Sequence, residues 1–344
     1  MSIDLAAPPD SHATANAPTP LAPVRVGILG AGKQATTHLV PALLHVPHAR
    51  ISAIADPDRA QRDGLADRLG VPARMASVTQ LLDSGLIDCL VAACPPQAHE
   101  QITAAAINAG IPVFVEKPPA ASTTVLAELA AAADRASVLT AVGMNFRSAA
   151  PVRRLRNLLG NKQIGAPSMI SIRHMASKPT TPMWDAPLWN SFLLAQAIHP
   201  IDLLLSLAGT PVVDIQPACR QAGDRVWFSL QTHHTDGTIG TVHCGNLAPR
   251  FEHRIEVTTS AGVTANLTGL AELTVSGTAV SPPGANTHWQ PSPLDVGYDR
   301  TGFGGELAAF CTAVVTGDRF TPNLTDLLPT YQIMDQLTPT DGTR

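Results

Sequence analysis

Aromatic and charged residues are both scarce in this sequence. Aromatic side chains make up 4% of the 344 residues, charged side chains make up 15%, and the formal net charge is −4. The chain therefore lacks the basic footprint of nucleic-acid-binding proteins and the aromatic platforms on which single-stranded bases stack. We expect it to bind a small molecule and no nucleic acid.

The sequence also lacks the usual features of secreted and membrane proteins. Its five cysteines form no Cys-x-x-Cys pair, and their odd number argues against a disulfide framework, so we expect a reducing, cytoplasmic location. No uninterrupted apolar run reaches the ~18 residues of a membrane span. Residues 1–22 are rich in Ala, Pro, Ser and Thr but have neither the basic start nor the apolar core of a signal peptide, which predicts a disordered tail.

The first motif follows a predicted buried strand over residues 24–29. Gly30-Ala31-Gly32-Lys33-Gln34-Ala35 is the Gly-x-Gly-x-x-Gly/Ala pattern of dinucleotide-binding domains, with Ala in the last place. Gly30 permits a tight turn, Gly32 lets a pyrophosphate approach the backbone, and Ala35 allows close helix packing. The helix predicted over residues 33–45 offers N–H groups to the phosphates at its start, and Pro41 is expected to kink it.

A carboxylate follows the second predicted strand, residues 51–55. Asp56 lies 26 residues beyond Gly30, where a carboxylate accepts hydrogen bonds from the adenosine ribose and repels a 2′-phosphate. This favours NAD over NADP, although Arg59 nearby could shift the balance. A cap on the helix that begins near Arg59 is the alternative role for Asp56.

Strands and helices alternate along residues 23–145, which predicts a doubly wound parallel sheet. One strand, Val113–Glu116, runs into Lys117 and two prolines. Ligands of open α/β sheets bind at the carboxyl ends of the strands, and a lysine held there against apolar walls can transfer protons. Lys117 is therefore a candidate catalytic residue, with a solvated turn as the alternative.

Several blocks of this sequence resemble the Gfo/Idh/MocA family of oxidoreductases. They are the glycine loop with His38 downstream, residues 55–57, residues 95–99 (Pro-Pro-Gln-Ala-His), Glu116-Lys117-Pro118, and residues 143–147 (Gly-Met-Asn-Phe-Arg). These blocks stand in the family's order and at about its spacing. The Glu-Lys-Pro tripeptide after an Ala-Gly-x-x-Val strand is the most specific of them, and the similarity covers about residues 24–340.

The resemblance implies a Rossmann domain over residues 23–145 and an α+β domain over residues 146–344. The open mixed sheet of the second domain would contact substrate and form a homodimer or homotetramer. The implied chemistry is hydride transfer between NAD(P) and a sugar, keto-sugar or cyclitol, with Lys117 contacting the nicotinamide ribose and the reacting oxygen. The cofactor contacts expected from these blocks are Gly30, Gly32, Lys33, Gln34, Asp56, Arg59, Cys94, Pro95, His99, Glu116, Lys117 and Asn145.

Residues 193–204 look like the family's second block, a helix with the pattern acid-x-x-x-His-x-x-Asp. His199 matches the histidine, which in the family hydrogen-bonds the substrate or acts as acid or base. Where the family's dehydrogenases carry Asp four residues earlier, this chain has Ala195, with Gln196 beside it. Three explanations stay open: Lys117 and His199 suffice, Gln196 replaces the carboxylate, or catalysis has been lost.

The remaining candidates are less specific. Trp184 and Trp189 lie in a Pro-rich loop and could cover a sugar face, with ordinary loop packing as the alternative. Arg147 and Tyr298 complete the expected substrate contacts, with Lys117, Trp184, Gln196 and His199. Histidines and a cysteine at positions 233, 234, 243, 244 and 253 match no tetrahedral metal site and fit alternating strand positions, so no metal site is predicted.

The sequence thus predicts an NAD(P)-dependent oxidoreductase. Lys117 would donate or accept the proton, and His199 would orient the substrate oxygen. The absence of Asp at position 195 favours reduction of a ketone. Two alternatives stay open: a cofactor-binding sensor or scaffold without turnover, and an imine reductase of a specialised biosynthetic pathway.

Overall fold

The computed structural model describes residues 23–277, 287–292 and 297–341. They form two compact units: the first unit contains residues 23–148 and 302–331, and the second unit contains the described residues of 149–301 and 332–341. The tail predicted over residues 1–22 lies outside the described residues and stays a prediction.

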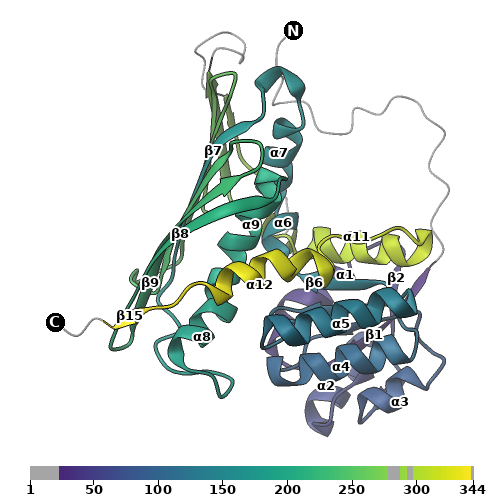
Figure 1. The fold of residues 1–344 in the computed structure, drawn as a ribbon. Helices are drawn as coiled ribbons and strands as arrows, with labels where there is room; N and C mark the ends of the chain where they lie inside the picture. The colour runs from purple at the N-terminus through teal and green to yellow at the C-terminus, as the bar shows by residue number, and fades with distance from the viewer. Residues whose placement is uncertain (1–22, 278–286, 293–296, 342–344) are drawn as a thin grey trace, which may run out of the picture. The chain divides into compact units, whose positions relative to one another are not determined.

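The first unit is built on a parallel sheet of six strands in the order β3-β2-β1-β4-β5-β6. Helices α4 and α5 contact each other, whereas α1 and α11 form a second contacting pair, and Figure 1 shows these pairs on opposite faces of the sheet. Every residue of β4, β5 and β6 is buried, as expected for strands covered on both faces. The predicted doubly wound fold is confirmed. The strands are β1 Val24–Leu29, β2 Ala49–Ala55, β3 Ala73–Met75, β4 Cys89–Ala92, β5 Val113–Glu116 and β6 Thr140–Gly143.

The helices of the first unit begin and end where the local sequence allows. Helix α2 is capped at its start by the Asp58 carboxylate and ends at Gly70, whose φ of 65° is left-handed. Ser77 and Ser122 cap two further helices by accepting backbone N–H hydrogen bonds. The helices are α1 Val40–Leu43, α2 Arg59–Leu69, α3 Val78–Leu82, α4 Pro96–Asn108, α5 Thr123–Ala136, α6 Asn145–Ser148 and α11 Phe303–Thr316.

The helix predicted over residues 33–45 is shorter and differently wound. It begins at Lys33, as predicted, and passes into a π-helical turn, η1 (Ala35–Leu39), in which the N–H of Val40 bonds to the carbonyl of Ala35. It then continues as α1 and ends at Leu43. Pro41 has no N–H to give to the carbonyl four residues before it, so the wider turn replaces the expected simple kink.

Helix α11 belongs to the first unit, although the sequence assigned everything after residue 145 to the second domain. It contacts β1 and β6, and the ring of Phe310 lies 5.8 Å from that of Phe114 on β5. Its apolar side chains complete one face of the parallel sheet, a contact between distant segments that no local pattern encodes.

The second unit contains a mixed sheet in the order β14-β13-β12-β11-β7-β10-β9-β8-β15. Most neighbours are antiparallel, but β7 pairs in parallel with β10 and β8 with β15. The predicted open mixed sheet is confirmed. The strands are β7 Pro167–Met175, β8 Val212–Ala222, β9 Arg225–His234, β10 Ile239–Gly245, β11 Glu252–Thr259, β12 Val263–Thr268, β13 Glu272–Gly277, β14 Thr287–Trp289 and β15 Thr340–Asp341.

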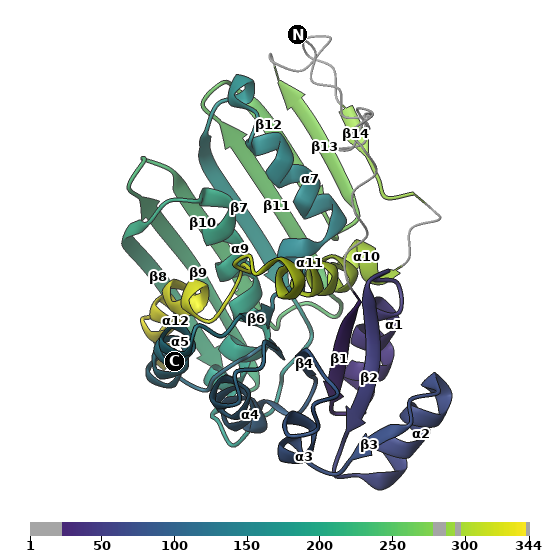
Figure 2. The same ribbon diagram turned by 90° about the vertical axis from the view of Figure 1, so that its right-hand side faces the viewer.

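Helices cover one face of this sheet. Helix α9 contacts β7 and β10, and α7 contacts β12 and β13, so that α7 lies across several strands in Figure 2. The burial of β9 alternates strictly along the strand, as the sequence pattern predicted. The remaining elements are α7 Ala150–Leu159, η2 Lys162–Ile164, α8 Leu188–Phe192, η3 Leu193–Ala197, α9 Ile198–Ala208, α10 Gly297–Thr301, η4 Thr325–Leu327 and α12 Leu328–Asp335.

One helical run, Leu188–Ala208, is long and apolar enough to cross a membrane by length and composition, but 78% of its most apolar window is buried inside the structure. A buried helix of this composition is typical of a protein core.

Candidate functional site

The glycine loop of the first unit lies against the chain that follows β4. Gly30 has a φ of 93°, and a Cβ placed on it would meet the carbonyl oxygen of Ala93 at 2.5 Å. Only glycine fits this approach without strain. Since β1 lies between β2 and β4, the loop occupies the point where the strand order reverses, which is where doubly wound sheets bind dinucleotides.

Gly32 is constrained differently. A Cβ at this position would meet nothing closer than Oε1 of Gln61, at 3.7 Å, which is an ordinary contact. The fold of the loop therefore does not require glycine here. Close approach of a ligand to the backbone is the remaining physical reason for it.

The Asp56 carboxylate organises the loop next to β1. It is buried, and its oxygens accept hydrogen bonds from the N–H groups of Ala31 at 2.7 Å and Asp58 at 2.7 Å. The alternative role of helix cap is wrong for Asp56, because Asp58 caps α2. Each Asp56 oxygen retains a second lone pair that a ribose hydroxyl could use.

Glu116 and Lys117 stand at the carboxyl end of β5. Glu116 is buried and accepts a hydrogen bond of 2.9 Å from Nε2 of Gln34, just beyond the glycine loop, whereas Lys117 is partly exposed. Burial raises the pKa of Glu116, while the Gln34 amide and the Lys117 ammonium oppose this shift. The contact joins the glycine loop to the strand that carries Lys117.

A second buried carboxyl group lies near Glu116 and was not among the residues predicted from the sequence. Glu306, on α11, is 2% exposed, and neither carboxyl oxygen has a hydrogen-bond partner among the described residues. Burial, and then the Glu116 carboxylate, raise the pKa of Glu306 well above its usual value. We therefore expect a neutral carboxylic acid. The feature of the sequence that could have indicated Glu306 is that it is a single charged residue within an apolar helix.

His99 connects two loops at this edge of the sheet. Its ring nitrogens lie 2.8 Å from the carbonyl oxygen of Pro118 and 2.9 Å from that of Cys94. Burial lowers the pKa of His99 despite these two carbonyls. Because both nitrogens face the backbone, His99 is suited to holding the loops in place. Cys94 is half-buried, Pro95 is exposed, and burial raises the pKa of Cys94 to about 12.

The other expected residues of the first unit lie after the same strand ends or on nearby helices. Asn145 and Arg147 are buried on α6, directly after β6. Lys33 is exposed beside the glycine loop, and the exposed Arg59 forms an ion pair of 3.3 Å with Asp63. Arg59 is thus directed toward its own helix.

The His199 helix of the second unit also contains a π-helical turn. In η3 the N–H of Ile198 reaches back five residues to the carbonyl of Leu193, just before Pro200 in α9. His199 is 7% exposed and Ala195 is 9% exposed. Gln196 is the one residue between Ser191 and Leu204 that is not buried.

Gln196 contacts a buried pair of histidines. His174 on β7 and His253 on β11 are cross-strand partners, each 1% exposed. Their Nδ1 atoms lie 3.2 Å apart, and Nε2 of His174 lies 3.1 Å from Oε1 of Gln196. His253 was predicted to be an ordinary strand residue, and His174 was not among the predicted site residues.

The Pro-rich loop presents Trp184 at a tight turn. Trp184 and Asp185 both have positive φ, 56° and 57°, and Ala186 donates a backbone hydrogen bond to Met183. A bulky residue in the left-handed region is strained. Trp184 is half-buried, whereas Trp189 is buried and donates to the carbonyl of Leu337, so packing explains Trp189.

Two further expectations concern Tyr298 and metal binding. Tyr298 is partly exposed on the short helix α10, in the second unit. Within residues 23–277, 287–292 and 297–341, no three His, Cys, Asp or Glu side chains are grouped as metal ligands would be.

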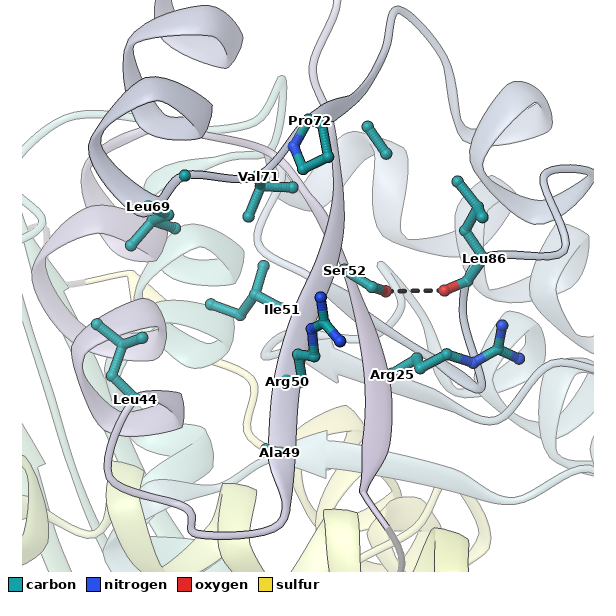
Figure 3. A pocket seen from close by; sticks show the side chains of 12 residues that line it. Arg25, Leu44, Ala49, Arg50, Ile51, Ser52, Leu69, Val71, Pro72 and Leu86 are labelled. Atoms are coloured by element: carbon teal, nitrogen blue, oxygen red, sulfur yellow. Dashed lines mark hydrogen bonds between the residues drawn. The ribbon is translucent and has the colours of Figure 1, made fainter.

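A hollow of about 570 Å³ lies elsewhere on the first unit. Figure 3 shows Arg25 and Arg50 among the residues that line it, together with the apolar Leu44, Ile51 and Leu69. Arg25 and Arg50 stand near the amino ends of β1 and β2, at the opposite ends of these strands from Gly30 and Asp56. The hollow is therefore separate from the glycine-loop edge.

Comparisons with known proteins agree with both units. Residues 24–144 match a family model described as "Oxidoreductase family, NAD-binding Rossmann fold", and residues 152–265 match one described as "GFO/IDH/MocA C-terminal domain". The first match confirms the predicted NAD-binding domain.

Individual relatives were also found. Inositol 2-dehydrogenase of Leifsonia xyli subsp. xyli is 28% identical over 205 residues, which are 59% of this chain and 58% of the relative. Inositol 2-dehydrogenase 2 of Paenarthrobacter aurescens is 28% identical over 262 residues, covering 70% and 75%. A crystal structure of a dehydrogenase from Chromobacterium violaceum is 33% identical, with a TM-score of 0.88 over 92% of this chain and 95% of that one. The alignment with the first relative thus spans less than two thirds of its length.

Proposed function

Because the chain belongs to the Gfo/Idh/MocA family of oxidoreductases, we propose that it transfers a hydride between NAD and a cyclitol or sugar-like substrate. The observation that carries the proposal is the placement of the glycine loop, Asp56 and Lys117 after the carboxyl ends of β1, β2 and β5 of one parallel sheet.

Each residue of the first unit has a distinct task in this proposal. The glycine loop binds the pyrophosphate of NAD, which supplies or accepts the hydride when bound. Asp56 accepts hydrogen bonds from the ribose, and its fixed, buried position favours NAD over NADP. Lys117 holds the proton that enters or leaves the substrate oxygen.

His199 of the second unit orients the substrate oxygen in this proposal. Its burial on α9, with the partly exposed Gln196 three residues earlier, supports a substrate contact on this helix. The relatives named inositol 2-dehydrogenase support a cyclitol as the substrate class. The absence of a carboxylate at Ala195 supports reduction of the ketone as the favoured direction.

The test is nicotinamide absorbance in both directions, with myo-inositol and its 2-keto derivative as the first probes. Lys117→Ala should abolish turnover while the Kd for NADH stays within a few-fold of wild type. Lys162→Ala is the matched control, because Lys162 is an exposed lysine of the second unit. Near-normal turnover in Lys117→Ala would refute the assignment.

A sensor without turnover is the second candidate, and Ala195 is the observation that favours it. Tight NADH binding by wild type, together with no hydride transfer to any cyclitol, sugar or keto-sugar in either direction, would select it. An imine substrate would show turnover only with a carbonyl and an amine supplied together.

We further propose a cytoplasmic homodimer or homotetramer that associates through the open face of the mixed sheet. Five free cysteines support the reducing location. Met169 on β7 and Val213 on β8 are 58% and 65% exposed, which supports a buried partner surface there. Light scattering should show a smaller particle for Met169→Lys with Val213→Lys, whereas an unchanged mass would exclude this face.

A further inference from the structure

The hydrogen bonds around Gln196 determine which polar atom of its side-chain amide contacts His174 and which is left for a ligand. His174 and His253 face each other through their Nδ1 atoms at 3.2 Å. Two facing nitrogens form a hydrogen bond only when one carries a proton and the other is bare. The other nitrogen of His174, Nε2, lies 3.1 Å from a carbonyl oxygen, Oε1 of Gln196, and a carbonyl oxygen only accepts.

With both imidazoles neutral, one proton arrangement satisfies both of these contacts. His174 donates from Nε2 to Oε1 of Gln196, so the Nδ1 atom of neutral His174 is bare and accepts from Nδ1–H of His253. Burial lowers the pKa of His253 to about 3, and His174 adds to this shift. His253 is therefore neutral at ordinary pH. The ring of Phe251, at 5.4 and 6.0 Å from the two imidazoles, closes the pair on one side.

The arrangement leaves the other end of the Gln196 amide for a ligand. Its Oε1 is held by His174, while its Nε2 makes no hydrogen bond to any residue that the structure describes. Gln196 is also the one partly exposed position of the otherwise buried stretch from Ser191 to Leu204. A primary amide held in this way presents N–H donors, whereas the family's carboxylate at position 195 could only accept hydrogen bonds.

We infer that Gln196 is a specificity-determining residue whose orientation is set by His174 and His253, and that it selects substrates presenting a carbonyl or carboxylate oxygen. The inference rests on the proposed function. A donor N–H stabilises the oxygen of a ketone as negative charge develops on it. It cannot accept the proton of a substrate hydroxyl, which a carboxylate can. The chain is thereby suited to the keto form of its substrate.

The first test reads the protons directly and needs no turnover. In the full chain labelled with ¹⁵N-histidine, we expect His174 protonated at Nε2 and His253 protonated at Nδ1. Gln196→Ala should shift the Nε2 resonance of His174, whereas Gln231→Ala, which removes a comparable Gln–His contact of 3.0 Å on β9, should not. A proton on Nδ1 of His174 would mean that Gln196 turns its oxygen outward, and would overturn the inference.

The second test exchanges the donor for an acceptor. With 2-keto-myo-inositol and NADH, Gln196→Glu should raise KM by roughly tenfold, the loss expected when a donor is replaced by a like-sized acceptor. The Kd for NADH should stay within twofold. His174→Leu should raise KM by a smaller factor, because it frees Gln196 without removing its amide. An unchanged KM in Gln196→Glu would refute the specificity role.

The two tests separate this inference from the proposed function. If wild type turns over neither myo-inositol nor its keto derivative, the proposed substrate class fails while the protonation of His174 still decides the orientation of Gln196. If wild type turns over the ketone but Gln196→Glu matches it, the inference fails and the proposed function stands.

Discussion

The two glycines of the loop after β1 should respond in opposite ways to the same substitution. Gly30→Ala places a side chain in the left-handed region, which costs about 1–2 kcal/mol. It also brings Cβ to 2.5 Å from the backbone oxygen of Ala93 and 2.9 Å from its carbonyl carbon, atoms that cannot swing away as a side chain can. We expect destabilisation of about 2–4 kcal/mol in total.

Gly32→Ala should leave the fold nearly unchanged. The added methyl group meets only Oε1 of Gln61 at 3.7 Å, so the change in unfolding free energy should stay within about 0.5 kcal/mol. A methyl group facing the pyrophosphate should nevertheless weaken NADH binding about tenfold or more, since tenfold requires only about 1.4 kcal/mol.

Urea unfolding followed by fluorescence, with NADH titration on each protein, measures both effects. Gly30→Ala should shift the unfolding midpoint strongly, and Gly32→Ala should shift only the Kd. Normal NADH affinity in Gly32→Ala would refute the placement of the pyrophosphate at this loop, whatever the stability of Gly30→Ala.

Three further substitutions test other parts of the structure by unfolding measurements. Since the pKa of Glu306 is raised in the folded state, its contribution to stability is present below about pH 4.5 and is lost as pH rises toward the folded pKa. The unfolding free energy of Glu306→Gln should therefore match that of wild type at pH 4 and exceed it at pH 8. A lower unfolding free energy than wild type at pH 8 would contradict this reasoning. Asn246 is fully buried and makes side-chain hydrogen bonds to the backbone of Pro179, Asp224 and Val226, so Asn246→Ala should cost about 2–4 kcal/mol, and a loss below 1 kcal/mol would contradict it. Asp185→Gly should raise stability by about 0.5–1 kcal/mol, because glycine adopts its φ of 57° without strain; a lower melting temperature would show that the Asp185 side chain has another role.

Local features of this chain were predictable because local chemistry determines them. Helix α7 spans Ala150–Leu159, where apolar side chains recur on one side of the helix. The turns at Gly237 and Gly262 occur where the sequence offers glycine for positive φ. The strand order around the glycine loop followed from the alternation of strands and helices.

Contacts between distant segments were not predictable from one sequence. Nothing near Glu306 indicates that α11 returns to the first unit and buries a carboxyl group near Glu116. The pairing of His174 with His253 depends on the register between β7 and β11, which are separated in the chain by 79 residues at this contact. The pattern of β8 is weak because much of this strand is exposed or half-exposed.

At Ala195, where the family's carboxylate is missing, residue spacing in the sequence does not predict which side chains lie on one side of the helix. An acid-x-x-x-His motif assumes that residues four apart lie on one side of a helix, which holds at 3.6 residues per turn. Here the hydrogen bond from Ile198 to Leu193 spans five residues, because Pro200 cannot donate to the carbonyl of Gln196. In such a turn the number of residues before His199 no longer predicts which of them lies on the same side of the helix as His199. The contact between Gln196 and His174 supports Gln196 as the replacement, which is one of the three explanations that the sequence left open.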